Sequence, residues 1–119
     1  MKALALLALA LPLTAAKSDP LADRIAGAPA DCITLSNTNG PEIIDAHTIL
    51  YREGAGRTIW KTGPVGACPS LAPLNPLIVD VWGAQLCRND RFRVVTPGSS
   101  IPSGYCRFTQ FTPYTRTPR

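Results

Sequence analysis

The segment Asp45-Ala46-His47 contains the only histidine of the 119-residue chain. In an extended segment, Asp45 and His47 lie on one face, where the carboxylate could orient the imidazole as a general base. The candidate serine nucleophiles all lie in predicted loops, and none belongs to a G-x-S-x-G elbow. They are Ser36, Ser70, Ser99, Ser100 and Ser103. A small hydrolase using Asp45 and His47 is therefore an alternative hypothesis rather than the main one.

A pair of carboxylates could instead hydrolyse a glycosidic bond. The candidate acids are Glu42, Asp45, Glu53, Asp80 and Asp90. Asp80 interrupts an apolar run, and burial there would raise the pKa of its carboxyl group. Buried acids usually have a partner. We therefore interpret Asp80 as a structural acid that is paired with Arg91 or Arg93, or that lies on an exposed face.

The four cysteines are Cys32, Cys68, Cys87 and Cys106. An even number in an exported chain predicts two disulfides. Zinc sites and thiol–disulfide oxidoreductases typically use close pairs such as C-x-x-C, which this sequence lacks. Phosphate-binding loops and dinucleotide-binding motifs are also absent. The sequence therefore predicts no metal site and no cofactor, and it leaves three disulfide pairings open.

Arginine dominates the charge of the C-terminal part of the chain. The formal net charge is +4, and the residues from 88 onward include six arginines but only one acid, Asp90. Arginine favours two-point contact with carboxylate or phosphate. Arg91, Arg93 and Arg107 are the candidate binding residues, because alternation in two predicted strands places them on exposed faces. A solvated strand face is the simpler interpretation of the same pattern.

Arginines also alternate with aromatic residues in Arg91-Phe92-Arg93 and in Tyr105-Cys106-Arg107-Phe108. Such alternation is typical of platforms that stack nucleic-acid bases. It is also ordinary strand amphipathicity, with the phenylalanines inside and the arginines outside. Because the charge is modest and an exported chain does not meet the usual nucleic-acid partners, we expect no nucleic-acid partner.

The first sixteen residues have the order of a secretory signal peptide. A positive Met1-Lys2 start precedes an apolar stretch and the small residues Thr14-Ala15-Ala16, after which we expect cleavage. The apolar stretch is shorter than the roughly 20 residues that span a bilayer. We therefore predict a periplasmic or secreted protein without a membrane span.

The remaining chain predicts one small domain. Residues 17–31 form an expected flexible leader, residues 32–111 a single β domain, and residues 112–119 a flexible tail. Short β-favouring runs alternate with turn-forming residues and give about six strands. The predicted strand segments are 32–35, 43–53, 57–62, 77–82, 91–95 and 105–111. This spacing predicts an all-β fold, a small barrel or a sandwich of antiparallel strands.

The hairpin around Gly54-Ala55-Gly56 has the clearest pattern, because a glycine-containing loop joins two β-favouring runs. The proline-rich segment 63–76 has no regular strand pattern. In a closed meander the first strand often ends beside the last, which would join Cys32 to Cys106. Cys68 would then tie the proline-rich segment to Cys87. We predict these two pairs.

The order of the cysteines resembles an uncharacterised family of small exported bacterial proteins. The matching features are a Cys-Ile opening strand, an Ile-Asp then Ile-Leu hairpin, and a Cys68-x-x-Leu71 loop. Leu86-Cys87-x-x-Asp90 before a strand and Cys106-Arg107 complete the pattern. The resemblance implies an exported β domain with paired cysteines, and it implies no activity.

These observations favour a non-catalytic binding or structural protein of the cell envelope. Its arginine-bearing face would contact an anionic envelope polymer, a lipid headgroup or a protein partner. The alternatives are the Asp45–His47 hydrolase and a secreted enzyme inhibitor.

Overall fold

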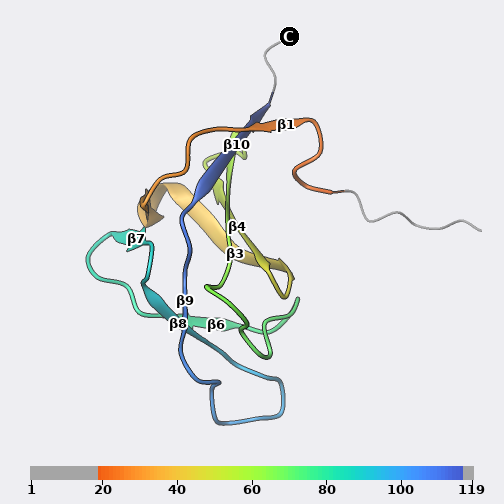
Figure 1. The fold of residues 1–119 in the computed structure, drawn as a ribbon, viewed down its shortest axis with the longest axis vertical. Coiled ribbons are helices and arrows are strands. Elements are labelled where there is room, and N and C mark those ends of the chain that lie inside the picture. Colours follow the sequence, from red (N-terminus) through yellow and green to blue (C-terminus); the bar gives the residue numbers. More distant parts are fainter. Residues whose placement is uncertain (1–18, 117–119) are drawn as a thin grey trace, which may run out of the picture.

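The computed structural model describes residues 19–116. The predicted signal peptide, its cleavage site and residues 117–119 lie outside the described residues. Ten β-strands and one short 3₁₀ helix are present in this part of the chain (Figure 1). The elements are β1 Arg24–Ala26, β2 Cys32–Thr34, η1 Leu35–Asn37, β3 Thr38–Asp45, β4 Thr48–Glu53, β5 Thr58–Thr62, β6 Leu77–Val79, β7 Gln85–Cys87, β8 Arg91–Val94, β9 Cys106–Arg107 and β10 Thr112–Arg116.

The strands form three antiparallel sheets. A five-stranded sheet has the order β1-β10-β5-β4-β3, a three-stranded sheet has the order β6-β8-β9, and β2 pairs with β7. The prediction of an all-β fold is thus confirmed. The strands do not close into a single barrel, and a third sheet makes the arrangement more complex than a two-sheet sandwich.

The predicted hairpin is confirmed as β4 and β5. Their register pairs Tyr51 with Trp60 and Glu53 with Thr58. Gly54 and Gly56 in the turn have φ values of 54° and 92°. Side chains with a Cβ rarely adopt this left-handed region, so the two glycines make the turn possible.

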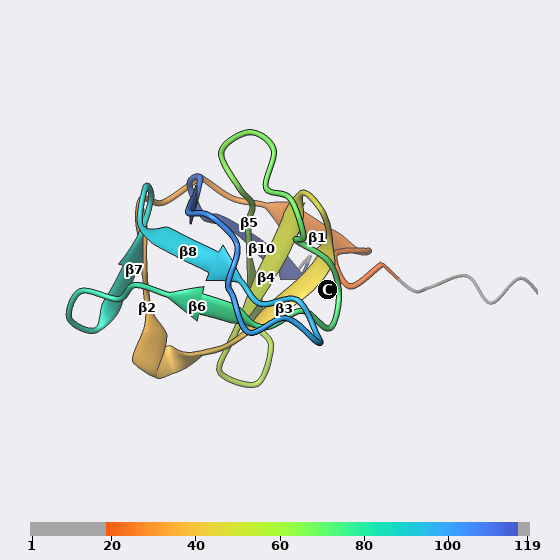
Figure 2. The same cartoon turned by 90° about the horizontal axis from the view of Figure 1, so that it is seen from below.

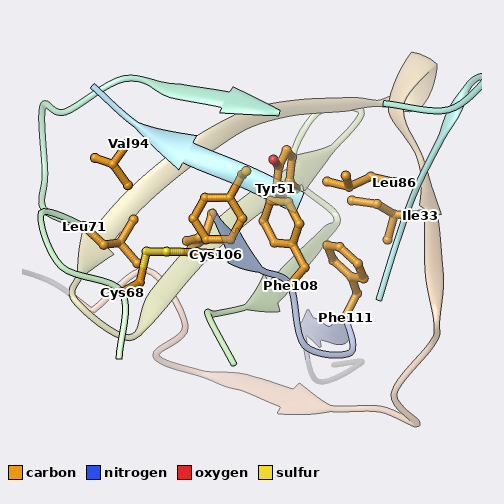
Figure 3. Packing of buried hydrophobic residues seen from close by; sticks show 11 residues of the cluster. Ile33, Tyr51, Cys68, Leu71, Leu86, Val94, Cys106, Phe108 and Phe111 are labelled. Atoms are coloured by element: carbon orange, nitrogen blue, oxygen red, sulfur yellow. A yellow bond between two sulfur atoms is a disulfide. The ribbon is translucent and has the colours of Figure 1, made fainter. Parts of the chain in front are cut away.

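A row of aromatic rings connects the two larger sheets. Phe92 of β8 contacts Phe108 with ring centroids 4.4 Å apart, and Phe108 lies 5.9 Å from Phe111. Phe111 meets Tyr51 of β4 edge-on at 6.4 Å. Figure 3 shows Tyr51, Phe108 and Phe111 in the middle of the buried cluster, with Ile33 and Leu86 on one side of them. The burial of these rings supplies much of the apolar area that stabilises the fold.

The predicted disulfide pairs are wrong. The bridges join Cys32 to Cys87 and Cys68 to Cys106. Cys32 lies directly opposite Cys87 in the β2–β7 ladder, with their Cα atoms 4.0 Å apart. The first strand does lie beside the last, but that pair is β1 and β10, which lie outside the cysteine-bearing strands. The prediction of two disulfides is confirmed, and no free cysteine exists among the described residues.

The expected flexible leader and tail contain two strands of the largest sheet. β1 occupies part of the leader, and β10 occupies most of the tail. In the sheet, β10 lies between β1 and β5. Pro113 argues against a central strand because proline cannot donate a hydrogen bond. Its carbonyl accepts the N–H of Gly27, so its nitrogen also faces the point where β1 has ended. The missing N–H therefore falls opposite Gly27, just beyond the end of β1, and not on the side that faces β5.

Three predicted strands differ from the structure. The segment 43–53 is divided by a turn at Ala46-His47 into the end of β3 and the whole of β4. Two other segments are shorter than expected. The segment 77–82 is a strand only over β6, an edge strand, and Val81 and Trp82 beyond it are exposed. The segment 105–111 is a strand only over β9. Strict alternation along residues 105–111 would place Phe108 and Phe111 on opposite faces, yet both are fully buried. The reason is that the chain leaves one sheet and enters the next between them.

The part of the chain that the structure describes has no helix with the length and apolar character needed to cross a membrane.

Candidate functional site

The three candidate arginines lie on one face of the sheet β6-β8-β9. Arg91 and Arg93 alternate along β8 with the fully buried Phe92 and Val94. The ladder places Arg107 of β9 directly opposite Arg91. Because side chains on one strand alternate between faces, the arginines point away from the core. Figure 2 looks towards this sheet, with β6 and β8 in front of the five-stranded sheet.

Two of these arginines contact the ring of Tyr105. The Arg91 Cζ atom lies 4.6 Å from the centroid of the Tyr105 ring, and the Arg93 Cζ atom lies 5.0 Å from it. Both distances are within the range of cation–π contacts, which contribute about 0.5–1 kcal/mol at exposed sites. Tyr105 as a whole residue is 54% exposed. It therefore offsets part of the repulsion between two guanidinium groups and leaves them near solvent.

We define the arginine–tyrosine face as Arg91, Arg93, Tyr105 and Arg107. Its one acidic contact within residues 19–116 is the ion pair between Arg91 and Asp80, with 3.9 Å between nitrogen and oxygen. This pairing confirms the interpretation of Asp80 as a structural acid. Half of the Arg91 side chain is exposed, and exposed pairs of this length contribute little to stability. The face therefore keeps a net positive charge.

Arg93 has an unusual feature. Its Nε atom is buried and has no hydrogen-bond partner among the described residues. An unpaired buried donor is uncommon in folded proteins and costs free energy. The stacking on Tyr105 and the burial of Nε together restrict the orientation of the Arg93 side chain.

The Asp45–His47 pair does not form the predicted arrangement. β3 ends at Asp45, and His47 lies in an exposed turn rather than in a strand. The Asp45 Oδ1 atom accepts the main-chain N–H of His47 at 2.8 Å, and this hydrogen bond is the main cause that lowers the pKa of Asp45. The carboxylate thus closes a turn instead of orienting the imidazole.

His47 also lines an open pocket of about 330 Å³ between β5 and the segment before β10. Lys61, Thr109 and Tyr114 are among its other lining residues, and no carboxylate or serine lines it. The serines and acids considered as partners of His47 are therefore not among the residues that line this pocket.

All five candidate acids have structural partners. The pairs are Glu42 with Arg52, Asp45 with the N–H of His47, Glu53 with the Trp60 indole, Asp80 with Arg91, and Asp90 with the N–H of Cys87. These contacts explain the acids as parts of turns and strand pairs. Within residues 19–116, no group of three His, Cys, Asp or Glu side chains is placed to hold a metal ion.

Tyr105 was not among the candidate binding residues predicted from sequence. Its alternation with Arg107 places both on one face, and this pattern could have identified it. The contact with Arg91 and Arg93 depends on the pairing of β8 with β9, which the sequence does not specify.

Comparisons of the chain with protein-family models, with curated proteins and with solved structures find no match. The resemblance to an exported bacterial family therefore stays a prediction, and the function must be argued from the geometry.

Proposed function

We propose that this chain is an exported, non-catalytic binding domain whose arginine–tyrosine face binds anionic ligands of the cell envelope. The observation that carries the proposal is the stacking of Arg91 and Arg93 on one Tyr105 ring, beside Arg107. A rigid sheet that presents restrained guanidinium groups suits ligands with several phosphate or carboxylate groups. The periplasm or the cell exterior is the proposed location.

The cysteine chemistry supports this location. Both disulfides are formed, and structural disulfides persist mainly in oxidising compartments. The signal-peptide pattern at the N-terminus points to the same compartment. A binding role also fits the acids, because those considered for catalysis are engaged in turns and ion pairs.

Titration calorimetry with polyphosphate, a soluble polyanion, tests the proposal. Replacing Arg91 and Arg93 together by glutamine should weaken binding by roughly tenfold, because each exposed pairing contributes about 0.7 kcal/mol. The matched control replaces Arg57 and Arg116 by glutamine. It changes the net charge equally, outside the face, and should leave the affinity within about twofold of the wild type.

Tyr105 provides a second pair of variants. Tyr105→Ala removes the ring under both guanidinium groups and should weaken binding, whereas Tyr105→Phe keeps the ring and should not. Equal weakening in the face and control variants would mean that total charge, rather than this face, determines binding. That result would overturn the proposal.

A further inference from the structure

Exposed apolar side chains are concentrated around the same sheet. Among residues 19–116, eight large hydrophobic side chains are exposed, and five belong to β6-β8-β9 or to its connecting turns and loop. These five are Ile78, Val81, Trp82, Ile101 and Tyr105. Trp82 and Ile101 are the most exposed of the five, at 79% and 78%. An apolar group of this kind beside a charged face indicates a binding surface.

The two most exposed of these five side chains lie beyond opposite ends of the sheet. Trp82 follows β6, near the start of β8, whereas Ile101 lies in the loop that follows the end of β8. In Figure 1 this loop extends below the sheet, and in Figure 2 the β6–β7 turn extends beyond its other end. We call Trp82 and Ile101, with the turn and loop that contain them, the two apolar projections. The arginines lie on the sheet between them.

Both projections have defined shapes. Trp82 pairs with Gln85 across a tight turn, in which Gly83 has a φ of 71°. In the other loop, the Ile101 N–H donates to the Ser99 hydroxyl at 3.3 Å. The apolar side chains are therefore presented by short hydrogen-bonded turns.

We propose that the arginine–tyrosine face and its two apolar projections bind an anionic lipid surface. Protein–protein interfaces typically have an apolar centre depleted in charge and a polar rim. Here the guanidinium groups occupy the centre, beside Tyr105 and Ile78, which lies directly opposite Arg93, and the more exposed Trp82 and Ile101 lie at the edge. A lipid surface suits this order, because headgroup phosphates meet the arginines while Trp82, Tyr105 and Ile101 enter the interfacial region.

This inference rests on the proposed function and names its ligand. An arginine close to an anionic membrane contributes about a fivefold gain in binding, and one buried aliphatic side chain contributes about tenfold or more. Neither contribution alone holds a protein on a membrane, but the combination gives reversible binding that requires both kinds of residue.

Co-sedimentation with vesicles tests the inference. The probe is a vesicle of equal parts phosphatidylglycerol and phosphatidylcholine, with pure phosphatidylcholine as the uncharged control. The wild type should sediment with the anionic vesicles only. Replacing Arg91 and Arg93 by glutamine should weaken this binding by roughly thirtyfold, and Ile101→Ser by roughly tenfold.

The matched controls lie on other parts of the molecule. The Arg57 and Arg116 double variant and Ile25→Ser on β1 should bind the anionic vesicles like the wild type. Ile25 is 55% exposed, so its replacement leaves the buried cluster intact. Anionic vesicles should also shift the tryptophan emission of the wild type to shorter wavelength, and Trp82→Phe should abolish that shift.

The outcomes separate this inference from the proposed function. Binding to polyphosphate without binding to vesicles would overturn the lipid inference and leave the proposed function intact. Vesicle binding that is unaffected by Ile101→Ser and by Trp82→Ser would also overturn it, and a protein or soluble polymer would then be the partner. Failure to bind both polyphosphate and vesicles would overturn both proposals.

Discussion

The disulfide between Cys68 and Cys106 should be one of the largest single contributions to the free energy of unfolding of this small domain. The two cysteines are 38 residues apart, and both are buried. Closing a loop of this length in the unfolded chain corresponds to about 4 kcal/mol in the chain-entropy model. Domains of this size have a total stability of about 5–15 kcal/mol. Removing the bridge should therefore remove a large fraction of the stability.

The variant to measure replaces both Cys68 and Cys106 by alanine, so that no free thiol is created. Urea unfolding should show a loss of about 4 kcal/mol. With a urea dependence of about 1.5 kcal/mol per molar, the midpoint should fall by roughly 2–3 M. Amide hydrogen exchange should increase most in residues 63–76, because this bridge ties that segment to β9.

Digestion of the unreduced wild type gives the control for the pairing. The cross-linked fragments should join Cys68 to Cys106 and Cys32 to Cys87. A fragment that joins Cys68 to Cys87 would contradict the structure. A loss of less than about 1 kcal/mol in the double variant, with the second bridge intact, would refute the entropy argument.

Two further predictions concern the core. Gly63→Ala should destabilise the fold by about 1–3 kcal/mol, because a Cβ atom at Gly63 would collide with the main-chain carbonyl of His47. The control is Gly104→Ala. Gly104 has open space around it, so this variant should change the urea midpoint little. Burial raises the pKa of the Tyr51 hydroxyl. Just above about pH 10 the hydroxyl therefore loses its proton in the unfolded chain but keeps it in the folded one, and the free energy of unfolding should fall by up to about 1.4 kcal/mol per pH unit. Tyr51→Phe should show a shallower loss in urea titrations between pH 10 and 11; an equally steep loss would mean that Tyr51 is not responsible.

Local sequence patterns predicted the parts of the fold that depend on neighbouring residues. The glycine turn identified the β4–β5 hairpin, and strict alternation in residues 91–95 identified which side chains of β8 face the core. Both patterns are short-range, because turn geometry and strand periodicity act within a few residues.

The missed features depend on contacts between distant segments. β1 has only three residues, and β10 contains a proline, so neither has a strong strand pattern of its own. They become strands because they pair with each other, and β10 with β5, in the five-stranded sheet. The disulfides likewise follow from the pairing of β2 with β7 and from the position of residues 63–76. The sequence contains no local pattern that determines these pairings.

In the candidate site too, some features follow from local sequence patterns and others depend on contacts between distant strands. The outward orientation of Arg91, Arg93 and Arg107 was predicted from alternation. Their assembly around Tyr105 required the antiparallel register of β8 and β9. The predicted orientation of His47 by Asp45 was wrong because a turn, rather than a strand, follows Asp45.

The most direct test of the arginine–tyrosine face is an NMR titration of ¹⁵N-labelled protein with polyphosphate. The account predicts that the largest changes in amide and arginine side-chain resonances occur at Arg91, Arg93, Tyr105 and Arg107. Arg57 and Arg116, which are equally cationic but lie outside this face, should change little. Changes spread evenly over all exposed arginines, or an absence of changes at Arg91 and Arg93, would contradict the account.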